Sequence, residues 1–154
     1  MREIFNAAGF FQEIRRNMRY GELSRLPLRL WRFELIHDSV ECDWFMRPSD
    51  PWDLQLPSHV REERITLQAL NDALKMRELI FRAFPSIQHA DLRIYRESKL
   101  EPPALMMTGR IDRKNEVLPR IISIVMRAKL YGFQFSLEDG VLERIGSSEL
   151  QVSY

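Results

Sequence analysis

Two short runs of alternating residues, on either side of residues 37–39, constrain this fold more than any other stretch of the chain. Apolar side chains occupy every second position in each run, which is the period of a half-buried strand. They are Trp31, Phe33 and Leu35 in the first run and Val40, Cys42 and Trp44 in the second. The two runs are out of phase, and the His-Asp-Ser segment between them is typical of a turn that hydrogen-bonds its own backbone. The stretch 30–47 therefore predicts an antiparallel hairpin.

The phase of the two runs also predicts the register of this hairpin. The expected cross-strand pairs are Leu35–Val40, Phe33–Cys42 and Trp31–Trp44 on the apolar face, and Arg32–Asp43 on the other. Glu34 opposite Glu41 is the one unfavourable pair, because like charges then face each other. The alternative is a single long strand with a bulge at residues 37–39, which would shift the phase in the same way.

Two helices flank the hairpin in the sequence. Residues 3–20 carry apolar side chains at the 3.6-residue period and are followed by Gly21, a typical stop. A longer helix is expected over residues 58–84, with Ser58 as its N-cap and Pro85 at its end.

The second half of the chain predicts further strands and one more helix. Asn115 can cap this helix and Gly132 can stop it. The dipeptide Asp139-Gly140 is typical of a hairpin turn. The expected strands are 91–96, 104–111, 133–137 and 141–145.

From the hairpin onward the expected order is strand, long helix, two strands, helix and strand. This is the order of the split β-α-β, or ferredoxin-like, antiparallel sheet, here with an added N-terminal helix and an additional hairpin strand. We expect one α+β domain over residues 1–154, with a helix and connector at 1–29 and a frayed tail at 146–154. The expected core is Trp31, Phe33, Leu35, Leu70, Leu74, Ile80, Phe81, Ile94, Ile121, Val125 and Phe135.

The composition is that of an ordinary folded protein and argues against several classes. Hydrophobic residues make up 45% of the 154 residues and charged residues 29%. The net charge of +1 gives no overall attraction to nucleic acid or to membrane surfaces, so neither is expected as a partner. One cysteine cannot form an internal disulfide. The pattern of a signal peptide and a long apolar span are both missing, so we expect a cytoplasmic protein.

The sequence contains none of the familiar catalytic motifs: no glycine-rich phosphate loop, HExxH, CxxC or GxSxG. Cys42 is expected to be buried and unreactive, because the strand phase points it to the apolar face. A weak alternative site consists of His37, Asp38, Glu41 and Asp43, whose side chains include the oxygen ligands of hard cations. Alternation sends Glu41 and Asp43 outward, so a solvated face is the favoured interpretation. The sequence thus indicates no catalytic residue, metal site or cofactor.

The proline-rich stretch after the hairpin is the strongest candidate for recognition. Its prolines, at positions 48, 51 and 57, lower the entropy of the free loop, so less ordering opposes binding. The candidate partner surface is Trp52 with Pro51, Asp53 and Arg47. In the alternative interpretation, Trp52 packs on its own domain and anchors the loop. The sequence favours the anchor, because an exposed indole is costly.

These features lead to two functional hypotheses of different classes. The leading one is a non-catalytic binding or assembly module that recognises a protein partner, or a second copy of itself, through this loop and an exposed sheet edge. The alternative is a small enzyme or small-ligand-binding domain with a pocket between the sheet and the N-terminal helix.

Overall fold

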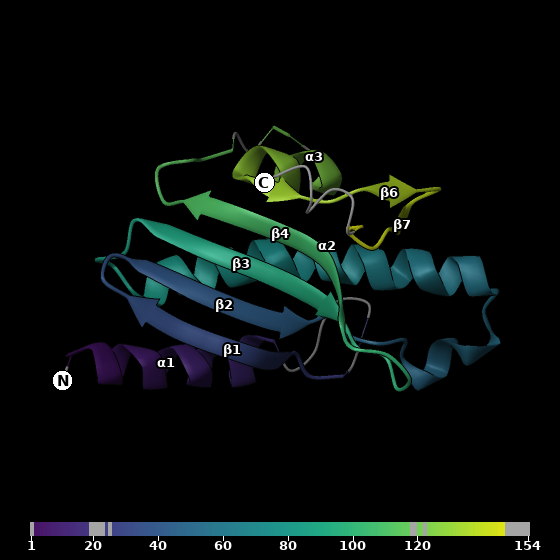
Figure 1. Ribbon diagram of the computed structural model, residues 1–154, viewed down its shortest axis with the longest axis horizontal. Coiled ribbons are helices and arrows are strands. Elements are labelled where there is room, and N and C mark those ends of the chain that lie inside the picture. Colours follow the sequence, from purple (N-terminus) through teal and green to yellow (C-terminus); the bar gives the residue numbers. More distant parts are fainter. Residues whose placement is uncertain (1, 19–23, 25, 118–119, 122, 147–154) are drawn as a thin grey trace.

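The structure is a computed structural model that describes residues 2–18, 24, 26–117, 120–121 and 123–146. Within these residues five strands form one mixed sheet with three α-helices on one side of it (Figure 1). The helices are α1 (Arg2–Asn17), α2 (Ser58–Ala83), α3 (Ile124–Tyr131) and the short 3-10 helix η1 (Pro51–Gln55). The strands of the sheet are β1 (Arg29–Ile36), β2 (Ser39–Phe45), β3 (His89–Arg96), β4 (Ala104–Asp112) and β5 (Phe133–Gln134). A separate hairpin consists of β6 (Leu137–Glu138) and β7 (Val141–Leu142).

The strands follow one another across the sheet in the order β1-β2-β3-β4-β5. All neighbours are antiparallel except β2 and β3, which are parallel and are joined by the crossover helix α2. The predicted α+β class is confirmed, but the split β-α-β order is wrong. A split unit keeps another strand between its two parallel strands, whereas β2 and β3 bond to each other directly. The two hairpins β1–β2 and β3–β4 lie side by side, so that β4 is on the far side of β3 from β2. The sheet is mixed because the pair of β2 and β3 is parallel.

The hairpin of β1 and β2 has the predicted turn, and the predicted register holds from residue 32 to that turn. A bulge between Leu30 and Arg32 then shifts the pairing, so that Leu30 lies opposite Trp44 in place of Trp31. Trp31 consequently belongs to the face of the sheet that the helices do not cover. It is 50% exposed, so its predicted place in the core is wrong.

The predicted clash of two glutamates in this hairpin is real, and a neighbouring arginine relieves it. Glu34 lies opposite Glu41. The Nη2 group of Arg32 donates to one carboxylate oxygen of each glutamate at 2.6 Å. These hydrogen bonds, the one to Glu41 first, raise the pKa of Arg32. One guanidinium thus bridges two like charges on adjacent strands.

The core fills the space between the sheet and the helices. Phe10 of α1 contacts Phe33 of β1 and Phe84 after α2, with ring centroids 5.2 and 5.6 Å apart. Trp44, near the end of β2, is fully buried. The predicted core residues that are buried are Leu70, Ile80, Phe81, Ile94 and Phe135, and those that are partly buried are Phe33, Leu35, Leu74, Ile121 and Val125.

The helix boundaries follow the predictions except at two caps. Pro57, not Ser58, precedes α2, and no side chain caps that end. Helix α3 begins only after Ser123, whose hydroxyl accepts an N–H from its first turn, so Asn115 is not its cap. Gly132 ends α3 in the left-handed conformation, as predicted, with φ of 114°.

The predicted strand at 133–137 is interrupted. Its first two residues pair with β4, and its last residue begins β6, which pairs with β7. The turn of this hairpin is the predicted one, with Asp139 and Gly140 at φ of 51° and 79°. The predicted helix end at residues 19–20 and the tail from 147 lie outside the described residues.

Candidate partner-binding surface

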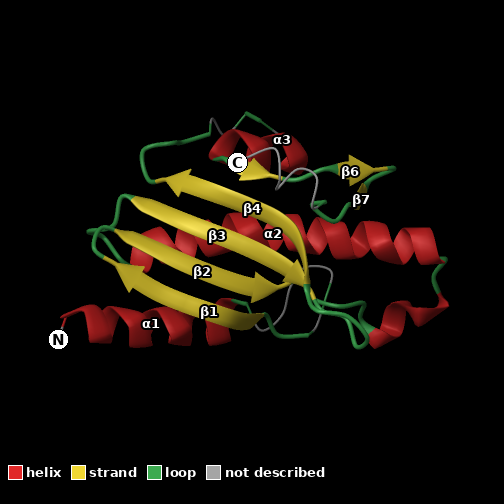
Figure 2. Ribbon diagram, viewed as in Figure 1, coloured by secondary structure: helices red, strands yellow, loops and turns green. Residues whose placement is uncertain are grey.

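One face of the sheet carries no helix in the described part of the chain, and this face is turned toward the viewer in Figure 2. Three aromatic side chains lie on it where β2 and β3 end. Trp31 stacks on Phe45 with ring centroids 5.1 Å apart and meets Tyr95 edge-on at 4.8 Å. Phe45 is nearly covered, whereas Trp31 is half exposed. We call these three residues the aromatic row.

The charges on the same face are largely paired with one another across the strands. Arg93 of β3 lies 3.4 Å from Asp43 of β2. Arg110 of β4 lies 3.7 Å from Asp91 of β3. Arg32 is occupied by its two glutamates. Few cations on this face remain for the phosphates of a nucleic acid, which demand an array of unpaired Lys or Arg groups.

The proline-rich loop starts from a buried ion pair. Arg47 is 2% exposed, and its Nε lies 2.9 Å from Oδ2 of Asp72 in α2. Gln68 donates to the other oxygen of Asp72 at 2.8 Å, and Arg47 donates to the carbonyl oxygen of Leu26 at 3.1 Å. Burial raises the pKa of Asp72 to about 6 and lowers that of Arg47. Arg47 therefore holds the loop in place, and its predicted role on the partner surface is wrong.

The rest of the loop is held by short polar contacts. The carboxylate of Asp50 accepts the N–H of Trp52 at 3.0 Å and caps η1. Asp53 lies 2.9 Å from Arg64 of α2 in an ion pair. Pro51 occupies the first turn of η1 and is exposed. Trp52 is 76% exposed, so the interpretation that its indole packs into the domain is wrong.

Exposed apolar side chains gather at this end of the molecule. Leu54 of η1 is 64% exposed, and Leu100, in the connection between β3 and β4, is 95% exposed. Figure 1 shows η1, this connection and the start of β1 at the same end of the sheet. We call this region, residues 29–31, 45–56 and 95–100, the loop end. It combines the aromatic row with the exposed residues Trp52, Leu54 and Leu100.

A cavity of about 590 Å³ opens at the loop end between the two connections and the start of α2. One wall is the ion pair of Arg96 and Glu62, which share two hydrogen bonds of 2.7 and 2.8 Å. The hydrogen bond from Arg96 lowers the pKa of Glu62. The lining residues are Met46–Ser49, Arg61, Glu62, Ile65 and Arg96–Lys99.

The four residues of the weak alternative site do not form a cation site. His37, with φ of 51°, and Asp38 form the turn, whereas Glu41 and Asp43 are engaged by arginines of the open face. Burial raises the pKa of Asp43. Within the described ranges, no group of three or more His, Cys, Asp or Glu side chains is placed to hold a metal ion. Cys42 is fully buried, and burial raises the pKa of its thiol, so the thiolate is disfavoured.

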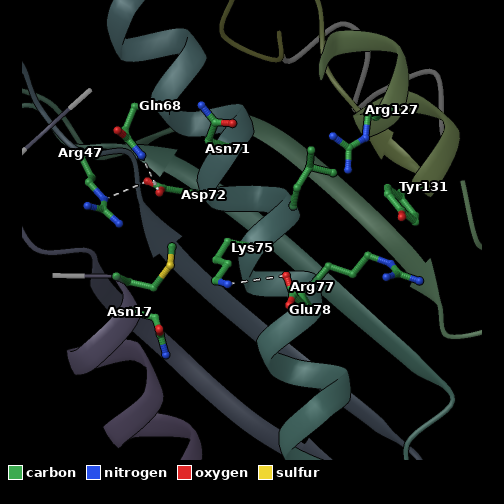
Figure 3. A pocket seen from close by; sticks show the side chains of 12 residues that line it. Asn17, Arg47, Gln68, Asn71, Asp72, Lys75, Arg77, Glu78, Arg127 and Tyr131 are labelled. Atoms are coloured by element: carbon green, nitrogen blue, oxygen red, sulfur yellow. Dashed lines mark hydrogen bonds and ion pairs between the residues drawn. The ribbon is translucent and has the colours of Figure 1, made fainter. Parts of the chain in front are cut away.

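A second hollow, a polar groove of about 520 Å³, crosses α2 between α1 and α3 (Figure 3). Lys75 and Glu78 form an ion pair of 3.7 Å in it, and the guanidinium of Arg77 stacks over the ring of Tyr131 at 4.2 Å. Burial lowers the pKa of Arg77. The charges of this groove are largely engaged within the chain, which leaves little to bind a ligand.

Sequence reasoning missed part of the loop end. The bulge that exposes Trp31 has a signal in the sequence, because Leu28 and Leu30 are out of phase with Phe33 and Leu35. Leu100 lies in a short loop and gives no periodic signal.

No protein-family model, curated protein or solved structure matches this chain. Among the described residues, no helix has both the length and the apolar character needed to cross a bilayer.

Proposed function

We propose that this protein is a non-catalytic binding module that recognises a protein partner through the loop end. The observation that carries the proposal is the high exposure of Trp52 on a loop that is fixed by contacts on both sides of this residue. A rigid aromatic side chain loses little entropy on binding, and tryptophan is enriched among residues that dominate binding energies. The aromatic row adds apolar side chains of the sheet at the same end of the molecule.

The sheet edge adds less to this surface. A bulge interrupts β1 near its start, and charged side chains follow it along the strand. Both features disfavour the addition of a further strand at an edge. The proposal therefore rests on side chains of the loop end and not on backbone pairing, and a second copy of the chain is one form that the partner could take.

Site-specific photo-crosslinking in the native host tests the proposal. Benzoylphenylalanine replaces Trp52 in one variant and Leu130 of α3, which is 49% exposed, in a matched control. We expect one or a few discrete crosslinked protein products from position 52 and none of these from position 130. A product of twice the chain mass would identify the partner as a second copy.

A third variant makes the test quantitative. Benzoylphenylalanine at position 31 in the aromatic row should give the same product, and adding Trp52→Ala to that variant should reduce its yield at least tenfold. Identical products from positions 52 and 130, or no product from position 52, would refute the proposal.

A further inference from the structure

The cavity at the loop end has a surplus of positive charge that the chain does not neutralise. Four cationic side chains line it, and two carboxylates do so. Glu62 is bound by Arg96, and Glu97 is bound by Arg29 at 2.7 Å from outside the cavity. Arg47 is neutralised by Asp72. Two cations of the lining are left over.

These two cations are Arg61, near the start of α2, and Lys99, in the connection between β3 and β4. Neither forms an ion pair within 4.0 Å of a described residue, although the charge of Arg61 also acts on Glu62, which Arg96 already binds. They stand on different elements that border the same cavity, so a single anionic group between them would face both.

The lining also contains polar atoms that lack partners. The Nε of Arg61 and the hydroxyl of Ser49 are buried and have no hydrogen-bond partner among the described residues. Buried polar groups in proteins nearly always have one, and an unsatisfied group lowers stability. A small rotation of the Arg61 guanidinium onto a carboxylate would satisfy the first of these atoms and bring its charge onto the ligand.

The lining also has an apolar part. It consists of Met46, Pro48 and Ile65. A ligand that fits must therefore present a carboxylate together with apolar groups. This combination is common in protein segments, whereas a nucleic acid would require the extended run of unpaired cations that the open face lacks.

We propose that this cavity binds an acidic side chain, Asp or Glu, of an extended partner segment, with apolar neighbours of that side chain lying on the loop end. Arg61 and Lys99 supply the charge complementarity. The inference rests on the proposed function and names the chemistry of the partner segment.

Selection from a random twelve-residue peptide library displayed on phage tests this inference. The baits are the full-length wild type, Trp52→Ala and two charge variants, Lys99→Glu at the cavity and Lys114→Glu, which is exposed at the opposite end of the sheet. Peptides enriched on the wild type and on Lys114→Glu should share an acidic position beside apolar residues. That position should be lost on Lys99→Glu.

Fluorescence anisotropy with the strongest peptide then measures the contact itself. Arg61→Gln, checked by its melting curve, should weaken binding about tenfold, and Lys114→Glu should change it less than about twofold. Replacing the acidic residue of the peptide by its amide should weaken binding to the wild type by a similar factor. The same replacement should hardly weaken binding to Arg61→Gln any further, because the contact is already lost in that variant.

The outcomes separate the two proposals. Peptides whose binding depends on Trp52 but not on Arg61 or Lys99 would overturn this inference and leave the proposed function standing. No enrichment on the wild type over Trp52→Ala would overturn both. A twelve-nucleotide single-stranded RNA should displace the labelled peptide less effectively than unlabelled peptide does. If the RNA displaces it at a lower concentration, the choice of an acidic protein segment as the ligand is overturned.

Discussion

The three tryptophans of this chain provide a graded test of the exposed loop. Trp44 is fully buried, Trp31 is 50% exposed and Trp52 is 76% exposed. If Trp52 serves recognition and not folding, Trp52→Ala should lower the free energy of unfolding far less than Trp44→Ala does.

The expected magnitudes follow from the buried area. A fully buried tryptophan removes up to about 250 Å² from water. About a quarter of this area is covered at Trp52, which at roughly 25 cal/mol per Å² limits its contribution to about 1.5 kcal/mol. The same reasoning gives about 3 kcal/mol for Trp31. Trp44→Ala should lower the free energy of unfolding by about 3 to 5 kcal/mol, the usual range for a large core residue.

Urea denaturation of the wild type and the three variants at neutral pH, followed by far-UV circular dichroism, measures these differences. The slope against urea should be similar for the wild type and Trp52→Ala. If Trp52→Ala lowers the free energy of unfolding by more than about 3 kcal/mol, comparable to the effect of Trp44→Ala, this indole supports the fold. The main argument for the loop as a binding surface would then be refuted.

Three other predictions concern the interior. Burial raises the pKa of Asp72 from its ordinary 3.8 to about 6, so this residue contributes most to the free energy of unfolding below pH 3.8, and that contribution is lost as pH rises through 6. Relative to Asp72→Asn, the wild type should lose about 2 to 3 kcal/mol of that free energy between pH 4 and pH 7 in urea titrations. A difference between the two proteins that does not change with pH would be evidence against this prediction. Cys42 should react with a thiol reagent only after denaturation, and rapid labelling of the native protein would show that the thiol is accessible. Gly132→Ala should lower the free energy of unfolding by about 1 to 3 kcal/mol, because φ of 114° strains any residue with a side chain and the new Cβ would lie 3.0 Å from the carbonyl oxygen of Arg110. Thermal melts measure this effect, and an unchanged melting temperature would contradict the prediction.

The features that could be predicted from the sequence are local ones. The β1–β2 turn, the long helix α2 and its end before Pro85, and the stop at Gly132 all depend on residues within a few positions of one another. Most of the residues that periodicity assigned to the core are buried or partly buried. Periodicity failed at Trp31, because one inserted residue in a strand reverses the face of everything before it.

The features that could not be predicted depend on contacts between distant parts of the chain. Strand order is one, since the same succession of strands and helices is compatible with a split or a direct β-α-β unit. The pair of Arg47 and Asp72 is another, because the two residues lie on separate elements and neither shows its partner in the sequence. Charged residues usually lie on the surface, and only its buried partner makes the interior position of Arg47 stable.

The single parallel pairing at the centre of the sheet has a consequence for the order of folding. The hairpins β1–β2 and β3–β4 join residues close in the sequence, whereas the parallel ladder joins Ser39 to His89, fifty residues away. Closing that long connection costs chain entropy before its contacts form, which slows the step. We therefore expect the two hairpins to form early and the ladder between β2 and β3 to form with the docking of α2. The middle of the finished sheet would then be the last part of it to assemble.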